Sequence, residues 1–185
     1  MALTKTPVCD FGKKAEYFKL KSIENKMISL NDVKGEKATL IMFICNHCPY
    51  VKAIIRDLAK DCNELIKEGV NSVAIMSNDT KNYPEDSFNN MIKFAKLNEF
   101  GEVNYLIDET QEIARKYGAV CTPDFFGYNQ DLKLQYRGRF RELKDLKPMS
   151  SGDSDLKVAM KMISKTQFGP KEQTPSMGCN IKWIN

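Results

Sequence analysis

Histidine is almost absent from this sequence, which has one such residue, His47, in 185. Because zinc sites are usually built from several Cys and His side chains at short spacings, a single histidine excludes most ligand sets of that kind. Long apolar runs are also lacking. No window approaches the ~18 apolar residues of a membrane span, and the N-terminus has no apolar stretch after basic residues. The sequence therefore predicts a soluble protein without a signal peptide or membrane segment, by default in the cytoplasm.

A strong excess of charge of one sign is missing as well. The formal net charge is +4, and most of the excess lies in residues 133–147, which carry six Lys or Arg and two acids. No nucleic-acid-binding motif accompanies this basic segment. The segment is therefore interpreted as a solvated loop, and neither nucleic acid nor a membrane is expected as a partner.

Internal repeats, linkers and low-complexity stretches are absent too, and the length suits a single domain, 1–185. The composition, 42% hydrophobic and 28% charged, allows a sizeable core without cross-links. A purely structural role for the six cysteines is therefore less favoured. The last stretch, about 166–185, shows no periodicity and is predicted to be an irregular tail.

Strand-like and helix-like patterns alternate along the rest of the chain, which predicts an α/β domain with a mainly parallel sheet covered on both sides. A hairpin near each end of this series adds antiparallel strands to a central mixed sheet. The predicted elements are a hairpin over 17–30, a buried strand over 38–45, a helix over 48–69, a strand over 70–77, a helix over 84–101, a strand over 103–108, a helix over 110–118, a hairpin over 124–138 and a helix over 153–165.

The segment "LIMFICNHCPYV" joins a buried strand to a helix through a Cys-x-x-Cys pair. Cys45 is predicted to end the strand, and Cys48 to lie in the first turn of the helix, where Pro49 is tolerated. A helix N-terminus favours a thiolate over a thiol. Cys45 is predicted to be the more exposed sulfur and the nucleophile, and Cys48 the buried thiol that resolves the mixed disulfide.

His47 lies between the two cysteines and is predicted to act on them. As an imidazolium it would stabilise the Cys45 thiolate, and as a neutral base it would accept a proton. Half a zinc site is an alternative for the pair, but a second ligand pair is missing, so no metal is predicted. The remaining cysteines occur singly: Cys9, Cys62, Cys121 and Cys179.

The motif "FICNHCPYV" and the later "VCTPDFF" resemble the thioredoxin-like superfamily, and the longer chain resembles its redoxin or peroxiredoxin-like branch over about residues 15–165. The resemblance implies a thioredoxin fold with an N-terminal β-hairpin extension and a redoxin-type α/β insertion over 78–103. It also implies that Pro123 is cis and lies against the active-site sulfurs, and that Thr122 contacts the substrate backbone. Asn46, inside the motif, is likewise assigned to substrate binding.

The sequence is more specifically similar to a group of uncharacterised bacterial peroxiredoxin-like proteins. These share the Asn-His-Cys-Pro-Tyr motif, a cysteine before Thr-Pro, and a Gly-Cys-x-Ile-Lys-Trp tail, found here at 178–183. Peroxiredoxins, however, carry Pro-x-x-x-Thr-x-x-Cys, and the matching positions before Cys45 are Ala38 and Met42. Thioredoxins often bury an Asp six residues before the first cysteine, where this chain has Thr39.

The other cysteines leave several roles open. Cys121 precedes the Thr-Pro pair and is either a third redox thiol or a small buried residue. Cys179, in the tail, is a resolving thiol, an intersubunit partner or an inert residue, and a Cys9–Cys179 bridge is a further alternative. Cys62 lies on the apolar stripe of its helix and is predicted to be an inert core residue.

These observations predict a thiol–disulfide oxidoreductase that exchanges a Cys45–Cys48 dithiol with protein or small-molecule thiols and disulfides. No bound cofactor is predicted, and the electron donor is not identified by the sequence. A thiol-dependent peroxidase with an antioxidant role is the first alternative. A non-enzymatic redox sensor or metal-binding module is the second, and either a monomer or a homodimer fits.

Overall fold

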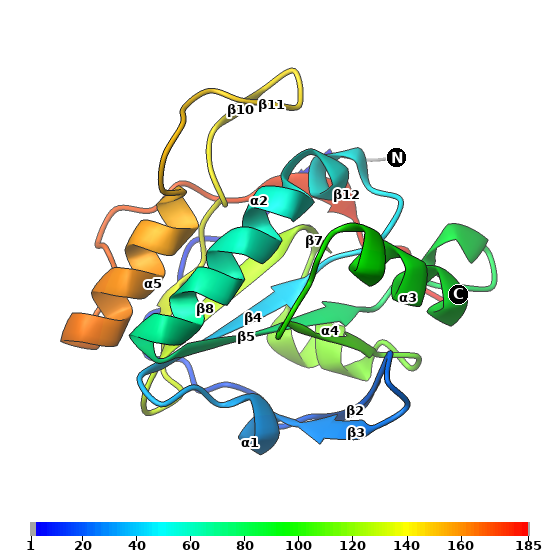
Figure 1. Cartoon of the computed structure of the whole chain (residues 1–185), viewed down its shortest axis with the longest axis horizontal. Helices are drawn as coiled ribbons and strands as arrows, with labels where there is room; N and C mark the ends of the chain where they lie inside the picture. Colours follow the sequence, from blue (N-terminus) through cyan, green and yellow to red (C-terminus); the bar gives the residue numbers. More distant parts are fainter. Residues whose placement is uncertain (1–2, 185) are drawn as a thin grey trace.

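The computed structural model describes residues 3–184 and is built around a seven-stranded mixed sheet with the order β3-β2-β6-β5-β4-β8-β9 (Figure 1). The central strands β4 and β5 are mostly apolar and almost wholly buried, as expected for strands covered on both faces. The strands of this sheet are β2 (Lys19–Ser22), β3 (Met27–Ser29), β4 (Ala38–Phe43), β5 (Val70–Met76), β6 (Asn104–Ile107), β8 (Asp124–Asn129) and β9 (Leu134–Tyr136).

Within this sheet, only the three central strands, β6, β5 and β4, run parallel to one another. β8 and β9 extend the sheet antiparallel on one side, and β2 and β3 do so on the other. The predicted mixed sheet with hairpins at its edges is therefore confirmed. The expectation that it is mainly parallel is wrong, because both hairpins join this one sheet and contribute four of its seven strands.

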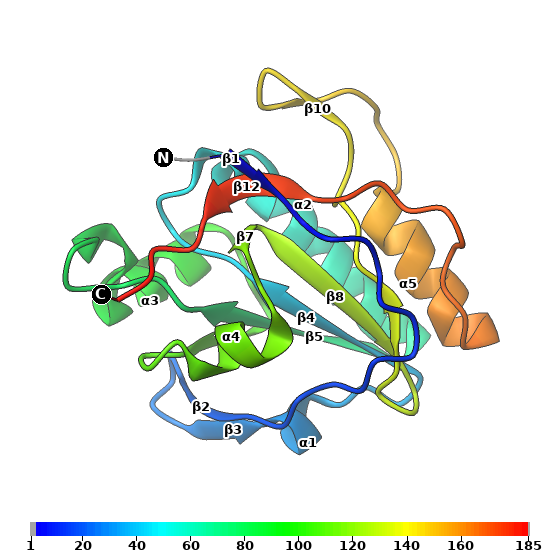
Figure 2. The same ribbon diagram turned by 180° about the vertical axis from the view of Figure 1, so that it is seen from behind.

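Helices cover both faces of the sheet, and each face has its own apolar cluster. α2 and α5 pack on one face, while α4 lies on the other, as the views from opposite sides show (Figures 1 and 2). The helices are α1 (Leu30–Val33), α2 (Pro49–Leu65, followed by a 3₁₀ turn, Ile66–Glu68), a 3₁₀ turn at Pro84–Asp86, α3 (Phe88–Leu97), α4 (Glu112–Tyr117) and α5 (Asp155–Thr166).

Most of the tail after α5 has no helix or strand, in line with the prediction of an irregular tail, but residues 177–180 form a strand that was not predicted. β12 (Met177–Asn180) is the middle strand of a second, small sheet, between β1 (Leu3–Lys5) and β7 (Cys121–Thr122). Figure 2 shows β12 and β1 crossing the molecule side by side, next to the start of α2. Because β1 and β12 come from opposite ends of the chain, no local sequence pattern predicts that they pair.

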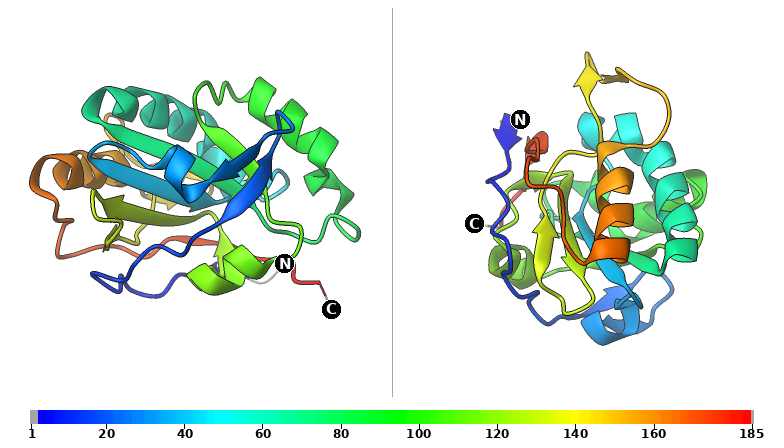
Figure 3. Two further views of the ribbon diagram at one scale, coloured as in Figure 1. Left: turned by 90° about the horizontal axis from the view of Figure 1, so that it is seen from below. Right: turned by 90° about the vertical axis from the view of Figure 1, so that its left-hand side faces the viewer.

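The basic segment 133–147 is only partly a solvated loop. It contains β9 and β10 (Leu143–Lys144), which pairs with β11 (Lys147–Pro148) in a hairpin that projects from the body of the protein (Figure 3). Two of its cations, Arg137 and Arg141, are buried. Arg137 forms two hydrogen bonds with the fully buried carboxylate of Asp124, at 3.0 and 3.3 Å, which explains how the charge is accommodated.

Candidate active site

The two motif cysteines lie where β4 gives way to α2, but their positions differ from the prediction. Cys48, not Cys45, is the residue that caps the N-terminus of α2, and Pro49 is the first helical residue, as expected. Cys45 lies two residues beyond the end of β4. The helix dipole therefore acts most directly on the Cys48 sulfur.

Neither sulfur is exposed to solvent. Cys45 retains 1% and Cys48 0% of its accessible surface, so Cys48 is buried as predicted, while Cys45 is scarcely more exposed than Cys48. The hydroxyl of Thr122 lies 3.3 Å from the Cys45 sulfur, and the carbonyl oxygen of the same residue lies 3.1 Å from the Cys48 sulfur. The strand before Pro123 thus covers both thiols.

The two thiols have opposite acidities. A hydrogen bond from the Cys45 thiol lowers the pKa of Cys48 to about 5, with help from the Cys179 thiol and the backbone N–H of Val51. The pKa of Cys45 is raised by that same hydrogen bond, by burial and by the nearby carboxylate of Asp86. The carbonyl oxygen of Thr122 favours the protonated form of Cys48, but more groups around the sulfur donate hydrogen bonds to it and favour the thiolate. These directions favour the anion on Cys48, opposite to the predicted Cys45 thiolate.

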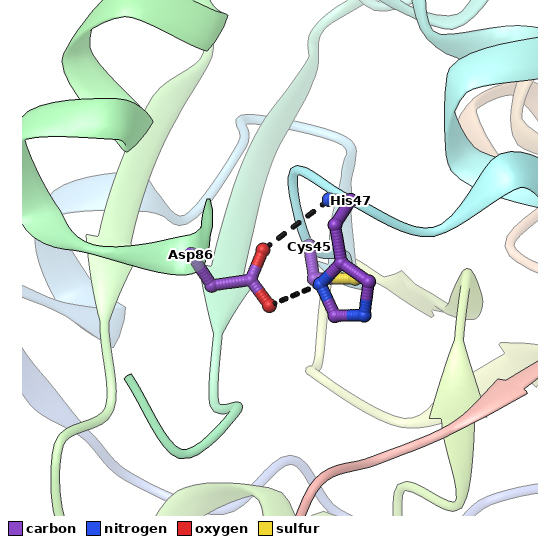
Figure 4. Close-up of side chains that lie close together, drawn as sticks. All are labelled: Cys45, His47 and Asp86. Carbon is purple, nitrogen blue, oxygen red and sulfur yellow. Dashed lines mark hydrogen bonds and ion pairs between the residues drawn. The ribbon is translucent and has the colours of Figure 1, made fainter. Parts of the chain in front are cut away.

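His47 is held by a carboxylate that sequence analysis missed. Its Nδ1 atom lies 2.7 Å from Oδ2 of Asp86, which is fully buried (Figure 4). The carboxylate also accepts hydrogen bonds from the backbone N–H groups of Asn46 and His47 and from the side-chain amide of Asn78. These contacts fix the position of the Asp86 carboxylate and hold the His47 ring close to the Cys45 sulfur.

Asp86 lies in the segment predicted as the start of a helix over 84–101. The structure divides that helix into a 3₁₀ turn and α3, because Ser87 has an extended ψ of 155°. An acid near a helix start is normally a solvated charge that complements the helix dipole. This pattern therefore favours a solvated charge at Asp86. The sequence Pro-Glu-Asp-Ser, which contains it, is the only local signal that the helix is interrupted here.

The side chain of Asn46, assigned to substrate binding, is held by internal contacts in this structure. Its side chain donates to the carbonyl oxygen of Glu85 and accepts from the hydroxyl of Tyr105. The residue fastens the active-site loop to the segment that carries Asp86. Thr122, also assigned to substrate, has its backbone paired with Cys179 of β12.

The Thr122–Pro123 peptide bond is cis, the isomer implied by the resemblance. Pro123 also lines a cavity of about 390 Å³ that lies between the tail and the loop after β9. Neither motif cysteine lines this cavity. Its wall combines apolar side chains with three basic ones, among them Tyr50, Phe140, Leu146, Lys5, Arg139 and Arg141.

The four single cysteines fall into distinct environments, and all six cysteines are free thiols. Burial raises the pKa of Cys62 to about 12, in agreement with its prediction as an inert core residue. Cys9 packs against the opposite apolar cluster from Cys179, and no bridge joins them. The thiol of Cys121 points to the carbonyl oxygen of Pro123 at 3.6 Å, whereas the sulfur of Cys179 lies 3.1 Å from that of Cys48.

Comparison with known proteins places this geometry in a family. The profile of the AhpC/TSA family matches residues 11–140. The chain belongs to the AhpC/TSA family. No curated protein gives a significant match. The family match contains the motif cysteines, His47, Asp86 and Pro123, but ends before the tail that carries β12.

Two solved structures match nearly the whole chain. An uncharacterized conserved protein from Geobacillus kaustophilus is 39% identical, with a TM-score of 0.94 over 100% of this chain and 97% of the other. A hypothetical protein from Sinorhizobium meliloti is 35% identical, with a TM-score of 0.89 over 98% of both chains. The thioredoxin domain of a thiol-disulfide oxidoreductase from Bacteroides vulgatus is 18% identical, with a TM-score of 0.58 over 69% of this chain and 86% of the other.

Together with the family match, these comparisons show that the chain has the thioredoxin fold of a redoxin family member. Within residues 3–184, no helix is both long and apolar enough to cross a membrane.

Replacing Asp86 by asparagine tests the buried carboxylate. The amide nitrogen of Asp86→Asn would face groups that are all donors, so we expect a loss of roughly 1–3 kcal/mol in unfolding free energy. Loss of the negative charge should also lower the pKa of Cys45, because Asp86 is one cause of its elevation. Chemical denaturation and alkylation of Cys45 in a Cys48→Ser background measure the two effects. Asp57→Asn, on the exposed side of α2, is the matched control, and an unchanged Cys45 pKa would contradict this role.

Proposed function

We propose that the protein is a thiol–disulfide oxidoreductase whose working pair is Cys45 and Cys48. The observation that carries the proposal is the opposite acidity of these two adjacent buried thiols at the start of α2. An anionic sulfur beside a protonated one is the arrangement that a dithiol needs to attack a disulfide and then complete the exchange.

In the reducing direction, the Cys48 thiolate attacks one sulfur of a substrate disulfide, and the first substrate thiolate leaves with the electron pair of the broken bond. Cys45 then loses its proton and attacks the Cys48 sulfur, which releases the second substrate thiolate and leaves a Cys45–Cys48 disulfide. The His47–Asp86 pair can accept this proton, since one ligand atom from each of the three residues lies within 4.8 Å of the others (Figure 4). We assign Pro123 to the surface that the substrate contacts, because the residue before it, Thr122, lies against both motif sulfurs.

The acidity of Cys48 also sets the direction in which the pair works best. A stabilised thiolate favours the dithiol form, which makes the disulfide the stronger oxidant. We therefore expect a reduction potential above the roughly −270 mV of thioredoxin. A separate thiol donor or acceptor, protein or small molecule, completes the cycle. The reducing cytoplasm is the proposed compartment.

The direct test is multiple turnover with insulin or an aromatic disulfide and excess dithiol. We expect activity in the wild type and in Cys62→Ala, which removes a thiol only from the core. We expect none above the uncatalysed rate in Cys45→Ser/Cys48→Ser. Equal activity in the double variant would refute the assignment. Peroxide consumption is measured in parallel. A peroxidase would consume peroxide faster than a free thiol does, but it would not reduce the disulfide substrates faster than a free thiol.

Cys45, His47 and Asp86 offer three atoms that could serve as ligands to a metal ion, so a metal-binding module is the competing function. The oxygens of Asp86, however, already accept from two backbone N–H groups, His47 and Asn78. An ion would have to displace donors that are themselves buried, which is costly. We expect elemental analysis of protein purified with added zinc to find far less than stoichiometric metal. Stoichiometric zinc that Cys45→Ser abolishes would favour the competing function.

A further inference from the structure

The tail brings a third sulfur to the motif pair. The sulfur of Cys179 lies 3.1 Å from that of Cys48, and Cys179 is 5% exposed. A disulfide has a sulfur–sulfur distance of about 2.05 Å, so the two atoms need to approach by only about 1 Å to bond. The site therefore presents Cys48 with two neighbouring thiols, one from the loop and one from β12.

Contacts on both sides of Cys179 fix this position. In the small sheet, Cys179 pairs with Leu3 on one side and Thr122 on the other. Before it, the hydroxyl of Ser176 donates to the carbonyl oxygen of Pro123 at 2.8 Å. After it, the N–H of Lys182 donates to Asn78 at 2.9 Å, and its carbonyl oxygen accepts from Asp79 and Gln111.

A glycine makes the close approach of the tail feasible. Gly178 lies over the cis-proline loop, and a Cβ added there would come within 2.0 Å of the Thr122 carbonyl oxygen and 3.0 Å of Pro123. Any side chain at this position would push β12 away from β7. The tail is therefore shaped to bring its cysteine against Cys48.

We propose that Cys179 is a third redox-active thiol. It replaces Cys45 as the disulfide partner of Cys48, so that a Cys45–Cys48 disulfide becomes a Cys48–Cys179 disulfide. This proposal rests on the proposed function, because the Cys45–Cys48 disulfide made in that cycle is its starting point. The tail strand thereby holds an internal exchange partner for the active-site pair.

The exchange step conserves electrons. Cys179 gives up its proton and attacks the Cys48 sulfur of the Cys45–Cys48 disulfide. As the new sulfur–sulfur bond forms, the bond to Cys45 breaks and its electron pair leaves with the Cys45 sulfur. Cys45 then takes up a proton, so the products are a Cys48–Cys179 disulfide and a Cys45 thiol, with no further oxidant required.

Both thiols that neighbour Cys48 are protonated in the reduced protein. Burial raises the pKa of Cys179 to about 12, and the hydrogen bond with Cys48, burial and Asp86 raise the pKa of Cys45. The position of β12 sets the distance between the sulfurs of Cys179 and Cys48, so we expect it to control how readily the exchange takes place.

Disulfide mapping by mass spectrometry after brief diamide treatment tests the inference. In Cys45→Ser we expect most molecules to carry a Cys48–Cys179 bridge, and in Cys179→Ser a Cys45–Cys48 bridge. Cys48 left as a mixed adduct in Cys45→Ser, with Cys179 reduced, would overturn the inference while leaving the proposed function intact. Absence of a Cys45–Cys48 bridge in Cys179→Ser would overturn the proposed function, and the inference with it.

Two further variants separate geometry from general damage. Gly178→Ala changes no sulfur, and by displacing β12 it should slow formation of the Cys48–Cys179 bridge on the order of 10- to 100-fold in the Cys45→Ser background. Cys121→Ser, next to the same strand, should leave the rate unchanged. An unaltered rate in Gly178→Ala, or equal slowing in Cys121→Ser, would contradict the role of β12.

Discussion

A Cys48→Ser variant is expected to lose disulfide exchange completely, including the first half-reaction. Serine cannot supply the thiolate that attacks the substrate, and the pKa of the remaining motif thiol, Cys45, is raised by burial and by Asp86. At pH 7 a thiol with a pKa of about 5 is almost wholly ionised, whereas an ordinary cysteine at ~8.5 is only ~3% thiolate. The first step should therefore vanish from the neutral and mildly acidic range.

The measurement is a rapid-mixing experiment with an aromatic disulfide under single-turnover conditions. The wild type and Cys62→Ala should both release a stoichiometric burst of aromatic thiol. Cys45→Ser should keep the burst but lose multiple turnover, because Cys48 is still present to attack the disulfide and no second motif thiol remains to complete the exchange. A burst of normal size and rate in Cys48→Ser would show that Cys45 is the attacking sulfur after all.

Removing Arg137 is expected to be the most destabilising single change outside the active site. Asp124 is fully buried at the start of β8, directly after Pro123, and the Arg137 guanidinium provides its compensating charge. The same guanidinium donates to the carbonyl oxygen of Gly118 at 2.8 Å and lies 4.5 Å from the ring of Phe126. Arg137→Leu leaves a buried charge without a partner, which costs roughly 3–5 kcal/mol of unfolding free energy.

The pH dependence identifies the cause of that loss. Burial raises the pKa of Asp124 to about 6, and Arg137 opposes the shift. A carboxyl whose pKa is raised on folding stabilises the fold below its unfolded pKa, and this contribution is lost as pH rises through the folded value. Without Arg137 the folded pKa rises further, so the defect should be larger at about pH 8 than at about pH 5.

Urea denaturation at the two pH values gives both quantities. Asp124→Asn/Arg137→Leu should recover part of the stability and lose most of the pH dependence, because no carboxylate remains to be desolvated. Arg56→Leu, an exposed position on α2, is the control for removing a guanidinium. A pH-independent loss in Arg137→Leu would assign the effect to packing on Phe126 and not to charge.

The parts of the fold that sequence analysis predicted correctly are those encoded by local patterns. The apolar run at β4, the periodicity of α2 and the turn between β2 and β3 are each contained in a short stretch of chain. Pro49 is compatible only with a helix start, and Ser154 caps α5 as a serine before a helix commonly does. Such signals depend on neighbouring residues and so can be read without tertiary structure.

The features that sequence analysis missed depend on contacts between distant segments. Asp86 contacts His47 across 39 residues, and Cys179 contacts Cys48 across 131. The reversed acidity of the motif pair follows first from the hydrogen bond between Cys45 and Cys48, and then from burial, from the Asp86 carboxylate beside Cys45 and from the Cys179 thiol beside Cys48. The last two groups come from distant segments, so their effect on the two sulfurs could not be predicted from the motif alone.

The state of the Cys48 sulfur is the central claim, and a pH titration of thiolate ultraviolet absorbance in the fully reduced protein tests it most directly. We expect a step worth a single thiolate with a midpoint near pH 5 in the wild type, absent from Cys48→Ser and moved to higher pH in Cys45→Ala, which removes the principal hydrogen-bond donor to the Cys48 sulfur. If the reduced wild type showed no thiolate below the range of an ordinary cysteine, or if the acidic step survived in Cys48→Ser, the assignment of the anion to Cys48 would be contradicted.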